Sequence, residues 1–83
     1  ALSPSRQMTL LAAIDSLVKN NSQFIIATHS PILMSYPDAE IFVLTDDDIR
    51  WTPYQETEHY TLTKQFLNNP QTMLRYLLEG EPE

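Results

Sequence analysis

His29 is the residue of this sequence whose type and position best suit chemistry. It follows a largely apolar run, 23–28, that predicts a buried strand, and open α/β sheets bind their ligands where such strands end. A neutral imidazole at that point can donate or accept one hydrogen bond, and near a phosphate it can stabilise charge or position a water molecule. A histidine in a strand-to-loop corner can also do no more than satisfy neighbouring backbone groups. Position alone leaves both interpretations open.

Two other groupings suggest chemistry less strongly. His59 lies near Glu56 and Glu58, which are potential metal ligands, but the spacing crosses the start of a predicted helix and no third ligand is evident. The helix dipole explains acidic residues in a first turn, so no metal site is predicted. Ser30 follows His29 directly, and adjacent residues of an extended strand point to opposite faces. Without a Gly-x-Ser-x-Gly elbow, the pair does not predict a serine hydrolase.

The strand before His29 and a helix before that strand must position it. Ser3 is a suitable N-cap, and Pro4 suits the first position of a helix. Apolar residues then recur at three- and four-residue spacing, which predicts an amphipathic helix over 4–19. The run at 23–28 does not alternate between apolar and polar residues, which indicates a strand covered on both faces, as in a parallel sheet. Such a sheet needs further strands, and the chain offers few.

The elements after the loop around His29 (the histidine loop, residues 28–31) are shorter. The predicted elements are a helical turn at 32–35, a β-hairpin at 39–45 and 49–54 around a loop at 46–48, and helices at 58–67 and from Pro70 to just before Gly80. The β-branched and aromatic content favours the strands, and Thr57 is a suitable cap for the first of these helices. The predicted order is α-β-β-β-α-α, an incomplete α/β domain with a β-hairpin after the histidine loop.

Composition limits the class of protein. The chain has 83 residues, of which 42% are hydrophobic and 19% charged, as in one small folded domain. It has no cysteine, which excludes disulfides, thiolate zinc sites and a catalytic thiol. The net charge of −6 repels nucleic-acid backbones, and no apolar run approaches the ~18 residues of a membrane helix. We therefore predict no direct contact of these residues with nucleic acid or a membrane.

A resemblance to a known family adds to this interpretation. The segment 24–31, Phe-Ile-Ile-Ala-Thr-His-Ser-Pro, resembles the switch-histidine loop of ABC-type ATPases, above all that of the soluble RecF- and SMC-like branch. Residues 1–4, Ala-Leu-Ser-Pro, are similar to the end of the family's D-loop. Residues 54–60 and 66–70 are similar to the C-terminal end of bacterial predicted ATPases often labelled ABC-transporter ATP-binding proteins. The resemblance covers nearly the whole chain.

The resemblance implies that residues 1–83 are the C-terminal part of a single ABC-type nucleotide-binding domain, an incomplete P-loop NTPase domain of a cytoplasmic bacterial protein. His29 would contact the γ-phosphate of ATP and help to hold the attacking water, with Ser30 beside it at the nucleotide. The residues implied at the interface where two such domains close over ATP are Ala1, Leu2, Ser3 and Pro4. Ser3 stands where the family's D-loop has an aspartate, so its contact across that interface would differ or be made by the hydroxyl. The implied partners are the N-terminal part of the same domain and a second nucleotide-binding domain, as a homodimer.

The parts of such a domain that bind the phosphates are absent from these residues. Gly80 is the only glycine, so there is no glycine-rich Walker A loop, and the Walker B acid, the catalytic glutamate and the signature motif are absent too. Phosphoryl transfer depends on a backbone cradle, a lysine and a held magnesium ion. The chain alone is therefore not expected to be an ATPase, and ATP and magnesium belong to the whole protein. The alternative is a small acidic module without nucleotide chemistry, which binds a protein partner through its aromatic hairpin and terminal helices.

Overall fold

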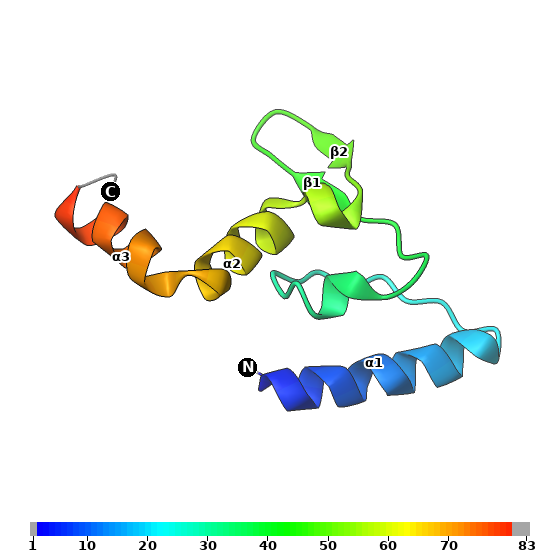
Figure 1. Ribbon diagram of the computed structural model, residues 1–83. Helices are drawn as coiled ribbons and strands as arrows, with labels where there is room; N and C mark the ends of the chain where they lie inside the picture. The colour runs from blue at the N-terminus through cyan, green and yellow to red at the C-terminus, as the bar shows by residue number, and fades with distance from the viewer. Residues whose placement is uncertain (1, 81–83) are drawn as a thin grey trace.

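Three α-helices, two short 3-10 helices and one β-hairpin make up the part of the chain that the structure, a computed structural model, describes, residues 2–80. The elements in chain order are α1 (Pro4–Lys19), η1 (Leu33–Ser35), β1 (Phe42–Leu44), β2 (Ile49–Trp51), η2 (Tyr54–Glu56), α2 (Glu58–Asn68) and α3 (Pro70–Glu79). In Figure 1, η1 lies between α1 and the hairpin, and α2 and α3 run away from the hairpin as an arm. The fold is a small mixed α/β arrangement of three helices and a two-stranded antiparallel sheet.

α1 begins and ends where the sequence predicts. The Ser3 side chain accepts a hydrogen bond from the Arg6 backbone N–H at 3.3 Å. Pro4 occupies the first turn, where its missing N–H is not needed. After the helix the chain turns at Asn21, whose φ of 68° lies in the left-handed region, which asparagine tolerates better than most residues. Local capping signals therefore set both ends of this helix.

The segment 23–28 forms no strand, which corrects the prediction of a strand buried on both faces. It runs as a loop between α1 and η1 (Figure 1), and no backbone group in it has a backbone hydrogen-bond partner within residues 2–80. Its apolar side chains are exposed, Ile25 to 96%. A strand needs a neighbouring backbone to satisfy its polar groups, and neither hairpin strand pairs with this segment. The order in the described part of the chain is therefore α-β-β-α-α instead of α-β-β-β-α-α.

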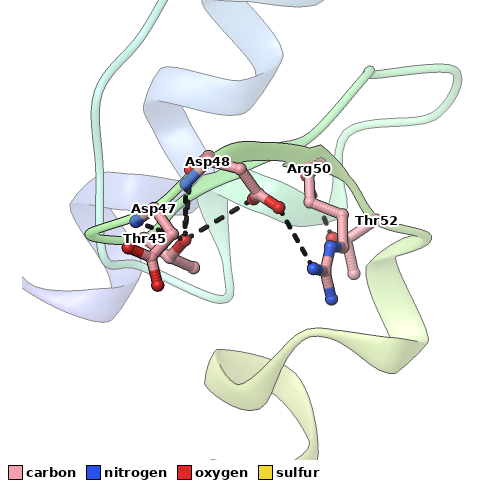
Figure 2. Close-up of polar contacts among 5 residues, drawn as sticks. All are labelled: Thr45, Asp47, Asp48, Arg50 and Thr52. Atoms are coloured by element: carbon pink, nitrogen blue, oxygen red, sulfur yellow. Dashed lines mark hydrogen bonds and ion pairs between the residues drawn. The ribbon is translucent and has the colours of Figure 1, made fainter.

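The predicted hairpin after the histidine loop is confirmed. β1 and β2 pair antiparallel, with Phe42 opposite Trp51. The loop between them contains no glycine. The Thr45 hydroxyl accepts a hydrogen bond from the Asp48 N–H at 3.0 Å, and the Thr45 N–H donates to the Asp48 carbonyl at 2.9 Å. The Asp48 carboxylate also pairs with Arg50 at 3.2 Å (Figure 2). Because threonine hydroxyls stabilise turns in this way, the connection closes without glycine.

α2 and α3 start at side-chain caps, as predicted. Thr57, 1% exposed, accepts a hydrogen bond from the Tyr60 N–H at 3.2 Å and donates its hydroxyl to the Tyr54 carbonyl at 2.7 Å. Asn69 caps α3, and Gly80 ends it with a φ of 71°, the left-handed conformation that glycine adopts after helices. The two terminal helices are thus bounded by the residues that the sequence indicates.

The arrangement is open for a chain of this size. Its radius of gyration is 15.8 Å, whereas a compact domain of the same length has a radius of about 12 Å. It exposes 7023 Å², whereas a folded protein of this mass exposes about 5100 Å². Ile14 and Thr57 are the only buried residues among those described. No helix between residues 2 and 80 is long and apolar enough to cross a membrane.

Candidate functional site

The two histidines of the sequence meet in the structure. His29, which follows the segment 23–28, places its Nδ1 3.2 Å from Nε2 of His59 in the first turn of α2. The two rings stack with their centroids 5.5 Å apart and their planes inclined by 23°. His29 is exposed and His59 is half-buried, and Nδ1 of His59 is buried without a hydrogen-bond partner in residues 2–80. The pair joins positions 30 residues apart in the sequence.

Hydrogen bonds within the histidine loop fix its shape. The Ser30 N–H donates to the Thr28 hydroxyl at 3.0 Å. The Ser30 hydroxyl accepts a hydrogen bond from the Leu33 N–H at 3.2 Å, and the Ser30 carbonyl accepts one from the Met34 N–H at 3.1 Å. Ser30 therefore holds the turn that leads into η1, and His29 lies immediately before this turn.

A tyrosine from η2 holds the other end of the histidine loop. The Tyr54 hydroxyl donates to the Pro31 carbonyl at 2.6 Å, and its ring packs against Tyr60 with the centroids 4.8 Å apart. Burial, with a smaller contribution from the neighbouring Tyr60, raises the pKa of the Tyr54 hydroxyl. The phenol therefore keeps its proton, and with it this hydrogen bond, at neutral pH. This contact and the histidine pair both connect the loop to the region where α2 begins.

Gln7 of α1 connects the histidine loop to the N-terminal end of the first helix. The Ser30 hydroxyl donates to Oε1 of Gln7, and Nε2 of Gln7 donates to the Leu2 carbonyl at 2.8 Å. One amide side chain therefore contacts both segments to which the family resemblance assigns a role at a nucleotide, the start of the chain and the loop at His29. A planar amide suits this position because it offers an acceptor and a donor at the same end.

A second contact holds the same region to the other end of α1. The Tyr36 hydroxyl, just after η1, donates to Oδ1 of Asp15 at 2.8 Å, and the Lys19 ammonium pairs with Oδ2 of Asp15 at 2.9 Å. The Lys19 ammonium and, second to it, the Tyr36 hydroxyl hold the pKa of Asp15 below its usual value. The carboxylate in turn raises the pKa of Tyr36. Together with Gln7, this contact anchors the segment from the histidine loop to Tyr36 along the helix.

The structure brings some of the predicted site residues together and leaves others apart. Leu2 and Ser30 are joined through Gln7, and Ser3 and Pro4 start the helix that carries Gln7. The ring of His29 pairs with His59, on the side of α2. Ala1, also predicted at the interface, lies outside the described residues.

Reasoning from the sequence misses two residues of this site, Gln7 and His59. Gln7 lies in line with the apolar stripe of α1, since Leu10, Leu11 and Ile14 follow it at three, four and seven positions. A polar residue on an apolar face is the signal that identifies it. The sequence considers His59 only as a metal ligand, because its partner is 30 residues away and no local pattern connects them. No group of three or more histidine, aspartate and glutamate side chains suited to a metal lies within residues 2–80.

The arrangement leaves one ring nitrogen of His29, Nε2, outside the histidine pair. The imidazole is exposed, and hydrogen bonds of the flanking loop determine where it lies. It can therefore offer one directed hydrogen bond to a ligand oxygen or to a water molecule.

Comparisons with known proteins find no match for this chain among protein-family models, curated proteins or solved structures.

Proposed function

We propose that this chain is the C-terminal part of an ABC-type nucleotide-binding domain and that His29 is its switch histidine. The proposal rests on the resemblance of segment 24–31 to the switch-histidine loop and of residues 1–4 to the end of the D-loop. The observation that carries it furthest is the bridge through Gln7, which links Leu2 to Ser30. The resemblance implies that one segment contacts the γ-phosphate and that the other lies at the interface that closes over ATP, so a direct link between them fits the proposal.

In this proposal His29 acts through a hydrogen bond from its free ring nitrogen. MgATP supplies the γ-phosphoryl group that is transferred to water. The His29 side chain would contact an oxygen of that group and help to orient the water, since phosphoryl transfer depends on positioning and charge stabilisation. Leu2, Ser3 and Pro4 would face a second nucleotide-binding domain. Residues outside these 83 would hold the phosphates and the magnesium ion, because Gly80 is the sole glycine here.

The open segment 23–28 also favours a larger domain. Its backbone hydrogen-bonding groups have no backbone partner in residues 2–80, and its apolar side chains are exposed. Unpaired extended backbone beside apolar side chains is a template for strand pairing. We propose that strands from the rest of the domain pair with this segment on both sides and place His29 at the end of a central strand.

A groove on the helical arm favours the second candidate function, a protein-interaction module. The groove between α2 and α3 has a volume of ≈ 460 Å³. It is lined by Leu62, Thr63, Phe66, Leu67, Met73 and Leu77. Its lining is mostly apolar, and grooves of this kind bind the apolar face of a partner helix. This function needs neither His29 nor a nucleotide, which separates it from the first.

The test is MgATP turnover by the complete domain that contains this chain, comparing wild type with His29→Ala. We expect turnover to fall by about 10²- to 10³-fold, the usual loss when one donor to the transition state is removed. ATP binding and helix content should be kept. Gln71→Ala, an exposed change on α3, is the control and should leave turnover unchanged. If His29→Ala has no effect, or if the complete domain does not bind ATP, the interaction module becomes the better account.

A further inference from the structure

We infer that His59 is a positioning residue that sets the tautomer of His29, so that His29 carries its proton on Nε2. The inference about the tautomer follows from the geometry of the two rings. Its use at a phosphate rests on the function proposed above. The roles of both ring nitrogens matter because the hydrogen bond made by one nitrogen of an imidazole decides which nitrogen is protonated.

The contact between Nδ1 of His29 and Nε2 of His59, at 3.2 Å, is a hydrogen bond in which one nitrogen must donate. If His29 donates, a neutral His59 must carry its own proton on Nδ1. That nitrogen is buried and has no partner in residues 2–80, so the proton would be a buried donor without an acceptor. In the opposite arrangement the same nitrogen is a buried acceptor without a donor, and among buried backbone groups an orphaned N–H is rarer than an orphaned acceptor. A positively charged His59 would bury the same unpaired N–H together with a charge, which is costlier still.

The remaining arrangement has His59 donating from Nε2 to Nδ1 of His29. A neutral His29 that accepts at Nδ1 has its proton on Nε2. Because the His29 side chain is exposed, this N–H is available to a ligand. It can donate to an anionic oxygen, whereas the other tautomer would present a lone pair that repels the same oxygen. His59 therefore adapts His29 to an anion such as a phosphate.

The surroundings of His59 suit this positioning role. His59 lies in the first turn of α2, two residues after the buried cap Thr57. The Thr57 hydroxyl is tied to the Tyr54 carbonyl, and the Tyr54 hydroxyl is tied to Pro31 in the histidine loop. The start of α2 and the histidine loop are therefore joined by two routes, and the ring of His59 is held where Nδ1 of His29 can accept from it.

The tautomers can be read directly from long-range ¹H–¹⁵N spectra of the ¹⁵N-labelled chain at pH 8. The sequence contains only two histidines, so the imidazole signals are readily assigned. We expect the proton of each ring to lie on Nε2. In His59→Ala, His29 should change to a mixture of tautomers, whereas His59→Gln keeps an amide donor and should preserve the Nε2–H form. Glu58→Gln, an exposed neighbour, is the matched control and should leave the spectrum of His29 unchanged.

Two outcomes would overturn the inference. One is a wild-type spectrum with the proton of His29 on Nδ1, which needs no variant and so does not depend on how the variants fold. The other is an unchanged His29 spectrum in a folded His59→Ala chain. The proposed function fails separately: if the complete domain turns over MgATP equally well with His29→Ala, the switch role is lost, while the spectra still decide the tautomer.

Discussion

At the scale of single residues, Gln7 joins the start of the chain to the histidine loop, so its contact with Ser30 should be measurable. We predict a coupling free energy of about 1 kcal/mol between Gln7→Ala and Ser30→Ala in a double-mutant cycle of unfolding. The cycle is needed because each change also removes another hydrogen bond, from Gln7 to the Leu2 carbonyl and from the Leu33 N–H to Ser30. Those losses cancel in the coupling term. The measurement is urea denaturation followed by circular dichroism.

Thr9→Ala provides the control for this cycle. Thr9 is exposed on the same helix, and its hydroxyl donates to the Ser5 carbonyl at 3.2 Å, away from Gln7. Changes at Gln7 and Thr9 should be additive within about 0.3–0.5 kcal/mol. If the changes at Gln7 and Ser30 were additive to the same degree, the hydrogen bond between these two side chains would not contribute to the free energy of unfolding.

At the scale of elements, the link between α1 and Tyr36 should depend on pH at both ends of the range. The pKa of Asp15 is lowered from its usual 3.8, first by Lys19 and then by Tyr36. A lowered carboxyl pKa contributes stability that is present above 3.8 and lost as the pH falls through the folded value. The pKa of Tyr36 is raised from 10.0, chiefly by its hydrogen bond to Asp15. That contribution is present below pH 10.0 and lost as the pH rises through the folded value.

The Tyr36 ring signal in a ¹H NMR titration checks this expectation. In Asp15→Asn the carboxylate that raises the pKa of Tyr36 is gone, so the phenol should lose its proton at a lower pH than in the wild type. The loss of stability at low pH that comes from protonation of the Asp15 carboxyl should also disappear. Asp46→Asn, a change in the exposed hairpin loop, should alter neither. A Tyr36 titration at the same pH in wild type and Asp15→Asn would show that the hydrogen bond is not formed in solution.

The elements also show what the sequence can and cannot predict. Helix ends are predictable because their signals are local: Ser3 before Pro4, Thr57, and Asn69 before Pro70 all cap where expected. The segment 23–28 is different. Its apolar pattern indicates that the segment should be buried, but it does not show which other strand would pair with it. The described residues provide no such strand. A β-strand forms only when a second segment pairs with it, so the sequence of one segment alone cannot establish it.

The residues of the site show the same difference between local signals and contacts between distant segments. His29 can be identified from the sequence because it stands at the end of an apolar run. Its partner His59 cannot, because the contact spans 30 residues, and the contact of Gln7 with Ser30 spans 23. The acidic residues before His59 direct attention to metal binding instead. Only the folded arrangement shows that this histidine contacts another imidazole.

At the scale of the whole molecule, the dominant feature is a large exposed surface that includes many large apolar side chains. The chain exposes 7023 Å², about 1900 Å² more than a compact protein of its mass. Stable protein–protein interfaces bury about 1200–2000 Å² in total, so the excess is of the size that one such interface would cover. The net charge of −6 opposes self-association, but this repulsion is largely screened beyond ~8 Å at physiological salt.

We therefore predict that the chain self-associates at 0.15 M salt and that the open segment 23–28 drives it. Ile25 is 96% exposed in a segment whose backbone is unpaired within residues 2–80, and a lysine on such an edge hinders strand pairing. Ile25→Lys should weaken association by about tenfold or more in sedimentation equilibrium, the effect of losing ~1.4 kcal/mol. Leu78→Lys makes the same charge change at a 78% exposed position of α3 and should have little effect. Equal weakening by both would assign association to general apolar surface, and a monomer at high concentration would contradict the prediction altogether.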